Sequence, residues 1–253
     1  MLSPRACVEL FHLVFLRALT ARGDDKGLFA LKGGCNLRFY FASVRYSEDI
    51  DLDVRVIARD TLRNKVDRLL SSPVVTSPLR AHGISIVDVS APKQTETTQR
   101  WKAGLEVHGL SAPLRTKVEF SRRKAIEGAA FESVARELLK PYGLTPFLAP
   151  HYATRAAVAQ KIHALAGRAE PQARDVFDLA LLLARPDAAT VVLTDDERRW
   201  LAPAIERAIG ISYDEHLAKV VAYLEPEHAF LYESRDAWDA LQSVVVASLE
   251  ALQ

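Results

Sequence analysis

The hydrophobic residues change their periodicity at the proline-rich segment KPYGLTPFLAP, residues 140–150. Before this segment, apolar and polar residues often alternate, as they do along β-strands with one buried face. After it, apolar residues recur at the spacing of amphipathic helices. The sequence therefore predicts an α+β chain in two parts, a sheet domain with an N-terminal helix over residues 1–142 and a helical domain over residues 151–253.

The same patterns predict the individual elements. Strands are expected in GLFALKGG (27–34, ending in a turn), DIDLDVRVI (49–57), ISIVDVS (84–90), QTETTQRWKAGLEVHG (94–109) and RTKVEFSRR (115–123). Helices are expected at the N-terminus, in 59–70 and, after the proline-rich segment, in 151–168, 171–185, 194–209, 213–224 and the last 25 residues.

The N-terminal segment resembles neither a signal peptide nor a membrane anchor. Ser3 can cap a helix that Pro4 begins, and Glu9 and His12 interrupt the apolar residues. No apolar run approaches the ~20 residues that a membrane span requires. Two cysteines are too few for a disulfide framework. We therefore expect a reduced, cytoplasmic protein.

The net charge of +1 excludes a field that attracts nucleic acid over the whole molecule. A nucleic-acid partner would have to use a local patch. Two patches are candidates, residues 115–124 and the group of Lys161, Arg168 and Arg174. The alternative for both is ordinary solvated surface charge.

Three aspartates, Asp49, Asp51 and Asp53, occupy every second position of an expected strand and would share one face. Neighbouring carboxylates on this face start ~7 Å apart, so they repel each other unless a cation lies between them. Proteins usually hold Mg²⁺ with one or two carboxylates and the phosphates of a substrate. The pattern is consistent with a metal site at Asp49 and Asp51, or with a solvated acidic strand. For Asp53 we expect a surface carboxylate.

Gly33 and Gly34 follow the preceding strand, after Lys32. Glycine backbone can approach an anion closely, and the lysine could contact the same phosphate or remain solvated. A turn that holds a nucleoside triphosphate next to the acidic pair is one interpretation, and an ordinary tight turn is the other.

These residues resemble a known motif. LKGGCNL…VRYSEDIDLDV (31–54) is similar to the first motif of the nucleotidyltransferase fold in AbiEii/AbiGii-type toxins, which include the MenT-like tRNA nucleotidyltransferases. TKVEFSRR (116–123) resembles a Lys-(Ile/Val)-Glu strand of that family, and KIHALAGRAEPQARDVFDLALLL (161–183) resembles its helical pair. The similarity covers about residues 28–185. It implies a polymerase-β-like mixed-sheet domain followed by a helical domain that contributes to the active-site cleft.

The resemblance implies catalytic roles for five residues. Asp49 and Asp51 would bind Mg²⁺, and Lys161 and Asp175 would act from the second half of the chain, with Asp178 orienting Lys161 or its neighbour Arg174. Glu119 would be a third carboxylate if its strand lies beside Asp49, able to bind metal or accept a proton. A surface ion pair between Lys117 and Glu119 is the alternative.

Two residues precede the acidic strand. By resemblance, Arg45 orients the acidic pair or contacts a phosphate. Ser47 matches a position that the antitoxin phosphorylates in some toxins of this type, and there a dianion would repel a triphosphate. A simple cap at the strand entry is the alternative for Ser47. Cys35 replaces the usual Thr or Ser and removes a hydroxyl from the phosphate turn.

The resemblance implies a Mg²⁺-dependent nucleotidyltransferase that moves NMP from an NTP to an acceptor hydroxyl. In the family this acceptor is often the 3′ end of tRNA, and the modification blocks translation. Such a toxin is paired with a cognate antitoxin. Two alternatives stay open. The acceptor could be a small molecule or a protein hydroxyl, which the near-neutral charge favours, or the protein could bind nucleotide without turnover.

Overall fold

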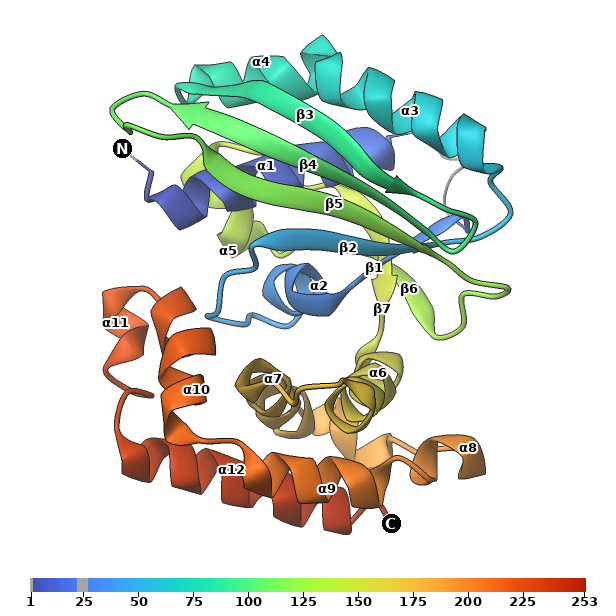
Figure 1. Cartoon of the computed structure of the whole chain (residues 1–253), viewed down its shortest axis with the longest axis vertical. Helices are drawn as coiled ribbons and strands as arrows, with labels where there is room; N and C mark the ends of the chain where they lie inside the picture. The colour runs from blue at the N-terminus through green and yellow to red at the C-terminus, as the bar shows by residue number, and fades with distance from the viewer. Residues whose placement is uncertain (1, 22–26) are drawn as a thin grey trace. The chain divides into compact units, whose positions relative to one another are not determined.

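The structure is a computed structural model that describes residues 2–21 and 27–253 (Figure 1). The chain forms two compact units. The sheet unit comprises Met1–Tyr40 and Tyr46–Tyr152, and the helical unit comprises Phe41–Arg45 and Ala153–Gln253. The five residues Phe41–Arg45 therefore interrupt the sheet unit and belong to the helical one.

A seven-stranded mixed sheet with the order β3-β4-β5-β2-β1-β7-β6 forms the sheet unit. Two pairs, β2–β5 and β1–β7, are parallel, and the other neighbours are antiparallel. The strands are β1 Phe29–Lys32, β2 Asp49–Val54, β3 Ile84–Gln94, β4 Thr98–Val107, β5 Leu114–Arg122, β6 Ala129–Ser133 and β7 Leu148–Tyr152. The strands expected from alternation correspond to β1 to β5, which confirms that part of the prediction.

Five helices accompany the sheet in the described part of this unit. They are α1 Pro4–Leu19, α2 Gly33–Tyr40, α3 Arg59–Ser71, α4 Pro73–Ala81 and α5 Arg136–Leu139, with the 3₁₀ turn η2 Lys140–Tyr142. As expected, Ser3 caps α1 by accepting a hydrogen bond from the Ala6 amide at 3.2 Å, and Pro4 is the first helical residue. The run from Ala6 to Leu16 is buried throughout, so α1 is a core helix.

The helices α3 and α4 lie along the β3–β4 part of the sheet (Figure 1). Trp101 of β4 is buried and its indole N–H donates to Asp67 Oδ1 of α3 at 2.7 Å. Trp101 also contacts Phe120 of β5 edge-on. Because side chains alternate along a strand, the odd-numbered residues of β4 face these helices and the even-numbered residues face the other way.

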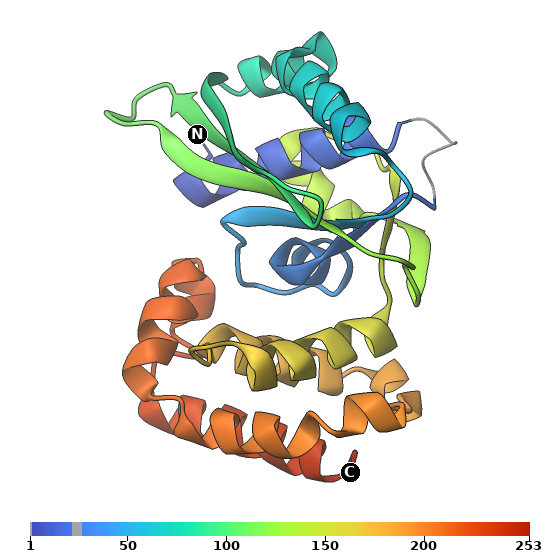
Figure 2. The same cartoon turned by 45° about the vertical axis from the view of Figure 1, so that its right-hand side comes forward.

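The helical unit consists of helices and short 3₁₀ turns (Figure 2). They are α6 Thr154–Gly167, α7 Ala173–Leu183, η3 Pro186–Thr190, α8 Asp195–Arg198, α9 Leu201–Gly210, α10 Tyr213–Lys219, η4 Val221–Tyr223, α11 Pro226–Ala229 and α12 Arg235–Glu250. Its core includes Trp238, which stacks on the buried His216 with ring centroids 4.6 Å apart. Among the described helices, none is both long and apolar enough to cross a membrane.

Two predicted segments have a different structure from the one expected, and β6 and α4 were not predicted. Leu148–Tyr152 forms β7 and pairs with β1, whereas we expected a linker and then a helix from His151. His151 and His163 are therefore not on one helix. Four of the five residues of β7 are buried, and a short run buried on both faces has no alternation to reveal it. Gly33 and Gly34 begin helix α2 instead of forming an isolated turn.

Candidate active site

The predicted acidic face is present on β2. Ile50, Leu52 and Val54 are fully buried in the core, so the alternating aspartates share the opposite face. In the parallel pair β2–β5, Asp49 lies opposite Lys117 and Asp51 lies opposite Glu119. Glu119 therefore lies beside the acidic pair, as its predicted role requires.

Each of these carboxylates has a cation nearby. Lys117 Nζ lies 2.7 Å from Asp49 Oδ2, and Arg100 Nε on β4 donates to Glu119 Oε2 at 2.6 Å. The expected alternative, a Lys117–Glu119 pair, is therefore replaced by two separate pairs with different partners. Both pairs are partly exposed, with 32% and 27% of the side-chain surface accessible for Lys117 and Asp49.

Asp51 lies against the first residue of α2. A Cβ atom at Gly33 would be 3.2 Å from Asp51 Oδ2, and Gly33 has a φ of +68°, which side chains disfavour. Burial raises the pKa of Asp51; Lys32 opposes this effect, and the nearby Asp49 and Glu119 carboxylates raise the pKa further. An additional cation at this position would relieve the repulsion between these carboxylates.

The start of α2 can also bind anions. The first N–H groups of a helix have no partner within the helix, and the helix dipole favours negative charge there. Gly33 and Gly34 carry no side chains that would block these groups. A carboxylate pair and an anion-binding helix start therefore adjoin each other in the sheet unit.

Asp53 is not the surface carboxylate that we expected. It is 3% exposed and binds Lys32 Nζ at 2.5 Å, Arg123 Nε at 3.1 Å and the Tyr152 hydroxyl at 2.8 Å. Lys32 is thereby occupied by Asp53, although β1–β2 pairing places it opposite Asp51. The structural role of Asp53 depends on partners from distant parts of the chain, which the local alternation could not indicate.

Cys35 belongs to a buried hydrogen-bond chain behind the acidic strand. The Thr116 hydroxyl donates to the Glu48 carbonyl at 2.7 Å, so it accepts from His12 Nε2–H at 2.7 Å. His12 Nδ1 then carries no proton and lies 3.5 Å from the Cys35 sulfur, whose S–H donates to the Asp49 carbonyl at 3.2 Å. Burial lowers the pKa of His12 to about 3 and keeps the ring neutral.

Ser47 and Cys35 meet at the same backbone group. The Ser47 hydroxyl donates to the Asp49 carbonyl at 2.9 Å. This contact matches the simple strand-entry role that we considered for Ser47. Cys35 is 1% exposed and points to this carbonyl, so its side chain supports β2 from behind instead of facing a phosphate.

The acidic pair fits a magnesium ion. In the ranges 2–21 and 27–253, no group of three or more His, Cys, Asp or Glu side chains is arranged to hold a metal. Magnesium does not require such a group, because it keeps waters and is often bound by one or two carboxylates together with substrate phosphates. Asp49 and Asp51 supply that number of oxygen donors beside the anion-binding start of α2.

The helical unit holds a second charge cluster, on α6 and α7. Lys161 Nζ lies 3.0 Å from Asp175 Oδ1 and 2.5 Å from Asp178 Oδ2. Arg168 Nε donates to Asp175 Oδ2 at 2.8 Å. Asp175 and Asp178 are fully buried, and Lys161 is 9% exposed. The residues predicted from the helical motif therefore come together.

The ionisation of this cluster follows from its pairing. Burial by itself would lower the pKa of Lys161, but Asp178 and Asp175 outweigh it and the pKa is raised. Burial by itself would raise the pKa of Asp175, but Lys161 and Arg168 outweigh it and the pKa is lowered. Each group thus stabilises the charged form of its partner.

Arg45 joins this cluster from the five-residue segment Phe41–Arg45. Its guanidinium donates to both carboxylate oxygens of Asp178 at 3.2 Å. The sequence predicted that Arg45 contacts the acidic pair or a phosphate, and it did not predict the pairing of Arg45 with Asp178. The two residues are 133 positions apart, so only the fold brings them together.

The basic segment 115–124 is less positive than its sequence indicates. Arg115 pairs with Asp88 at 2.5 Å, Lys117 pairs with Asp49, and Arg123 pairs with Asp53. Arg122 donates to the Ile57 carbonyl and to Gln99. Internal carboxylates and backbone thus satisfy much of this patch.

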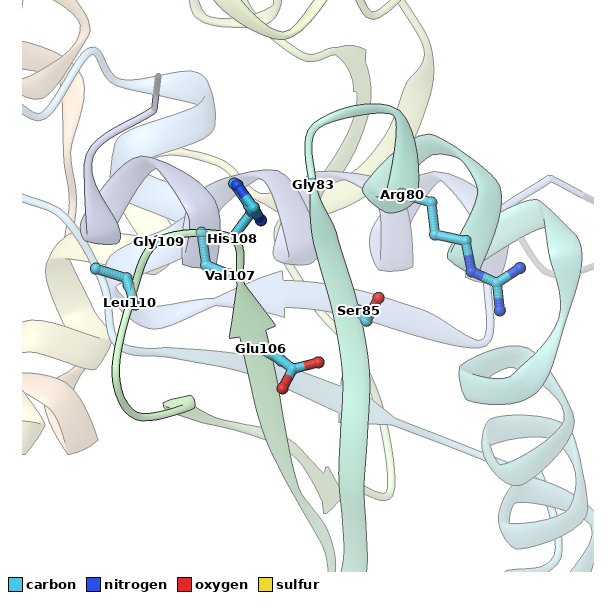
Figure 3. Close-up of a pocket in the computed structure, with 8 residues that line it drawn as sticks. All are labelled: Arg80, Gly83, Ser85, Glu106, Val107, His108, Gly109 and Leu110. Atoms are coloured by element: carbon cyan, nitrogen blue, oxygen red, sulfur yellow. The ribbon is translucent and has the colours of Figure 1, made fainter.

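A surface pocket lies elsewhere in the sheet unit (Figure 3). It has a volume of about 500 Å³ and is lined by side chains of both charge signs. Its lining residues are Arg80, Gly83, Ser85, Glu106, Val107, His108, Gly109 and Leu110. None of the predicted site residues is among them, so this pocket is not the candidate active site.

The sequence matches the profile of one protein family over residues 14–244, the family described as "Nucleotidyl transferase AbiEii toxin, Type IV TA system". Comparison with curated proteins gave no match. JHP933 from Helicobacter pylori is a similar solved structure, with a TM-score of 0.60 and 19% identity, covering 99% of this chain and 96% of that one. A "putative nucleotidyltransferase" from H. pylori has a TM-score of 0.60 and 17% identity, covering 96% of this chain and 95% of that one.

At these identities, the solved structures show the fold alone, and they confirm the mixed-sheet nucleotidyltransferase architecture. The family profile spans most of the sequence, from the end of α1 to α12, and so includes every predicted site residue. The chain therefore belongs to the AbiEii family of nucleotidyl transferase toxins from type IV toxin–antitoxin systems.

Proposed function

We propose that this chain transfers NMP from an NTP to the 3′ end of tRNA, in a reaction that requires Mg²⁺. Blocked tRNA would halt translation, and a cognate antitoxin would restrain the toxin in the cytoplasm. The observation that carries the proposal is the closeness of Asp51 to the start of α2: a Cβ atom added at Gly33 would lie 3.2 Å from Asp51 Oδ2. A larger residue at position 33 would separate the acidic pair from the start of α2.

The sheet unit would bind the nucleotide. The free N–H groups at Gly33 and Gly34 would hold its phosphates. Asp49 and Asp51 would hold Mg²⁺, which when bound neutralises phosphate charge and orients the leaving group. The closeness of Gly33 to Asp51 supports this arrangement because it leaves no side chain between the carboxylate and the helix start.

Glu119 would accept the proton of the attacking hydroxyl. In this step the acceptor oxygen bonds to the α-phosphorus, the bond to the pyrophosphate breaks, and the hydroxyl proton moves to the carboxylate. The pairing of β2 with β5 supports this role because it puts Glu119 beside Asp51. Arg100 donates to Glu119 and would orient its carboxylate.

The helical unit would contribute Lys161 and Asp175 to the same reaction. The Lys161 ammonium would stabilise the charge that develops on the departing pyrophosphate. Its two buried carboxylate partners support this role by keeping the lysine protonated. Arg45 would act through Asp178, which it shares with Lys161, and so would position the lysine.

The test is a transfer assay with each α-labelled NTP in turn, Mg²⁺ and total tRNA. The matched variants are Asp49→Ala and Asp60→Ala, which removes an exposed carboxylate on α3. We expect label in tRNA with the wild type and with Asp60→Ala, and a loss of roughly 1,000-fold with Asp49→Ala. Equal activity of the two variants would show that Asp49 is not needed for transfer, and the proposed role of the acidic pair would be wrong.

The same assay separates the alternatives. If the protein binds NTP but no label enters RNA, the acceptor is a small molecule or a protein hydroxyl, and the tRNA part of the proposal is wrong. If it binds no NTP in the presence of Mg²⁺, the transferase proposal itself is wrong. A chelator should abolish transfer, and Mg²⁺ should restore it.

A further inference from the structure

The acidic face of β2 continues across the neighbouring strands as a row of cations. From Asp49 the paired positions run through Lys117 on β5 and Lys102 on β4. From Asp51 they run through Glu119 to Arg100 on β4 and Lys93 on β3. Because directly paired residues project from the same face of a sheet, these side chains share the face that carries the acidic pair.

Two members of this row carry uncompensated charge. Lys117 and Arg100 are paired with Asp49 and Glu119. Lys93 and Lys102 are exposed, and neither side chain makes an ion pair or a hydrogen bond with any residue of 2–21 or 27–253. The positive charge therefore increases with distance from the acidic pair. Lys93 lies three strands from Asp51, about 14 Å across the sheet.

This face is open in the β3–β4–β5 part of the sheet unit. The helices α3 and α4 cover the other face (Figures 1 and 2). Two side-chain contacts join β4 to α3: Trp101 donates to Asp67, and Gln99 donates to the Arg59 carbonyl. Trp101 and Gln99 alternate with Arg100 and Lys102 along β4. The two cationic side chains therefore project away from the helices of this unit.

The row has a defined end. On the same face, Gly104 lies between Arg115 and Asp88, which pair with each other across it at 2.5 Å. Beyond this neutral pair is the exposed Glu106, which lines the pocket at the far end of β4 (Figure 3). The free positive charge is thus confined to the half of the strands next to the acidic pair.

We propose that Lys93 and Lys102, with Lys117 and Arg100 behind them, bind the phosphate backbone of a single-stranded RNA segment whose 3′ end reaches Asp49 and Asp51. This inference rests on the proposed function and specifies where the acceptor binds. Unpaired lysines on an open sheet are complementary to a polyanion. The β4 and β5 positions on this face carry no aromatic side chain, so the row recognises phosphates rather than bases.

This assignment explains how a chain with a net charge of +1 binds RNA. The contact needs only a few cations, provided that they lie beside the reacting atoms. It also predicts weak dependence on the sequence of the bound segment, because phosphate contacts position a nucleic acid without identifying its bases.

The test compares two double variants with the same loss of charge. Lys93→Gln/Lys102→Gln removes the free cations of the row. Arg63→Gln/Arg68→Gln removes two exposed cations of α3, on the helix-covered side. Binding of a short fluorescent single-stranded RNA is measured by anisotropy without NTP, between about 50 and 200 mM salt.

We expect the Lys93/Lys102 variant to bind RNA roughly tenfold more weakly. The slope of log affinity against log salt should fall by about 1.4, which corresponds to two lost phosphate contacts. The α3 variant should change affinity by about twofold or less, since α3 covers the opposite face of the sheet and its charges do not face the row. Lys93→Arg/Lys102→Arg should retain the wild-type affinity.

In the binding experiment, three results would overturn the inference: absence of RNA binding by the wild type, an unchanged affinity in the Lys93/Lys102 variant, or an equal loss in the α3 variant. The transfer assay tests the proposed function independently. With tRNA as acceptor, the Lys93/Lys102 variant should raise KM for RNA and leave the KM for NTP unchanged. If the wild type transfers NMP to tRNA and the variant has the same KM for RNA, the proposed function stands and the proposed RNA-binding row is wrong.

Discussion

The sheet unit and the helical unit each hold a charge cluster, and the two clusters differ in their access to solvent. In the sheet unit, Lys117 and Asp49 retain 32% and 27% of their side-chain exposure. In the helical unit, Lys161 retains 11%, and its two aspartate partners retain none. An exposed pair exchanges its counter-ion at little energetic expense, whereas a buried pair does not.

This difference indicates separate physical tasks. The Asp49 carboxylate can release Lys117 and accept another cation, as a metal ligand must. The Lys161 ammonium stays fixed between two carboxylates and keeps its charge. The helical cluster also connects α6, α7 and the segment Phe41–Arg45, so it stabilises the unit in addition to any role in transfer.

The sharpest test of the comparison is Lys161→Met. It leaves two buried carboxylates with one cation fewer, and breaking a buried pair in this way lowers stability by about 3–5 kcal/mol. The free energy of unfolding is measured by urea denaturation, with Lys219→Met on α10 as an exposed control. A loss below about 1 kcal/mol would show that the buried cluster contributes little to folding.

The pH dependence of the free energy of unfolding tests the same cluster, with a smaller expected effect than Lys161→Met. The pKa of Asp175 is lower in the folded chain than its unfolded value of ~3.9, so the unfolded chain takes up the proton first as the pH falls. The stabilisation is therefore complete above the unfolded pKa and is lost as the pH falls through the folded value.

Urea denaturation of the wild type and Asp175→Asn checks this sign. The stability difference between them should be constant near neutral pH and should shrink below about pH 4. A difference that grows on acidification would contradict the assigned pairing of Asp175 with Lys161 and Arg168.

The acidic site of the sheet unit depends on Gly33. Gly33→Ala should destabilise the protein by about 1–2 kcal/mol because an alanine at positive φ is strained, and the new Cβ should displace the Asp51 carboxylate. Gly143→Ala is a matched control, since Gly143 has a φ of +62° and no atom within 4 Å of an added Cβ.

Both glycine variants should lose similar stability, and only Gly33→Ala should lose NMP transfer. Thermal unfolding and the labelled-NTP assay measure the two effects. If both variants kept full activity, close approach of Asp51 to α2 would not matter for the reaction.

The smallest effect is expected for Lys117→Met. Loss of this partly exposed pair should change the free energy of unfolding by less than about 1 kcal/mol, several times less than Lys161→Met. Mg²⁺ binding at Asp49 should become tighter, because no lysine competes for the carboxylate. Titration calorimetry with Mg²⁺ measures this, and weaker binding would show that Lys117 supports the site.

Local patterns predicted the acidic strand and most of the elements. Alternation identified the shared face of Asp49 and Asp51, and helical spacing located α6 and α7. The pairing of Glu119 with Asp51 was expected only on the condition that their strands are neighbours, which a sequence alone does not establish.

Three of the missed features depend on the packing of residues that are distant in the sequence. Asp53 was expected at the surface, but three side chains from β1, β7 and the end of β5 enclose its carboxylate. Arg45 reaches Asp178 across 133 residues. The strand β7 lacks alternation because both of its faces are buried.

The segment Phe41–Arg45 belongs to the helical unit although it lies within the sequence of the sheet unit, and this limits how the protein can be cut into separate fragments. The chain passes from one unit to the other after Tyr40, after Arg45 and after Tyr152. A fragment ending at Tyr152 would keep Arg45, whose side chain is 7% exposed in the whole chain, and would lose its Asp178 partner. A fragment starting at Ala153 would keep Asp178 and lose the arginine. Neither half is thus a module that recombination could transfer intact, and the two are expected to be inherited together.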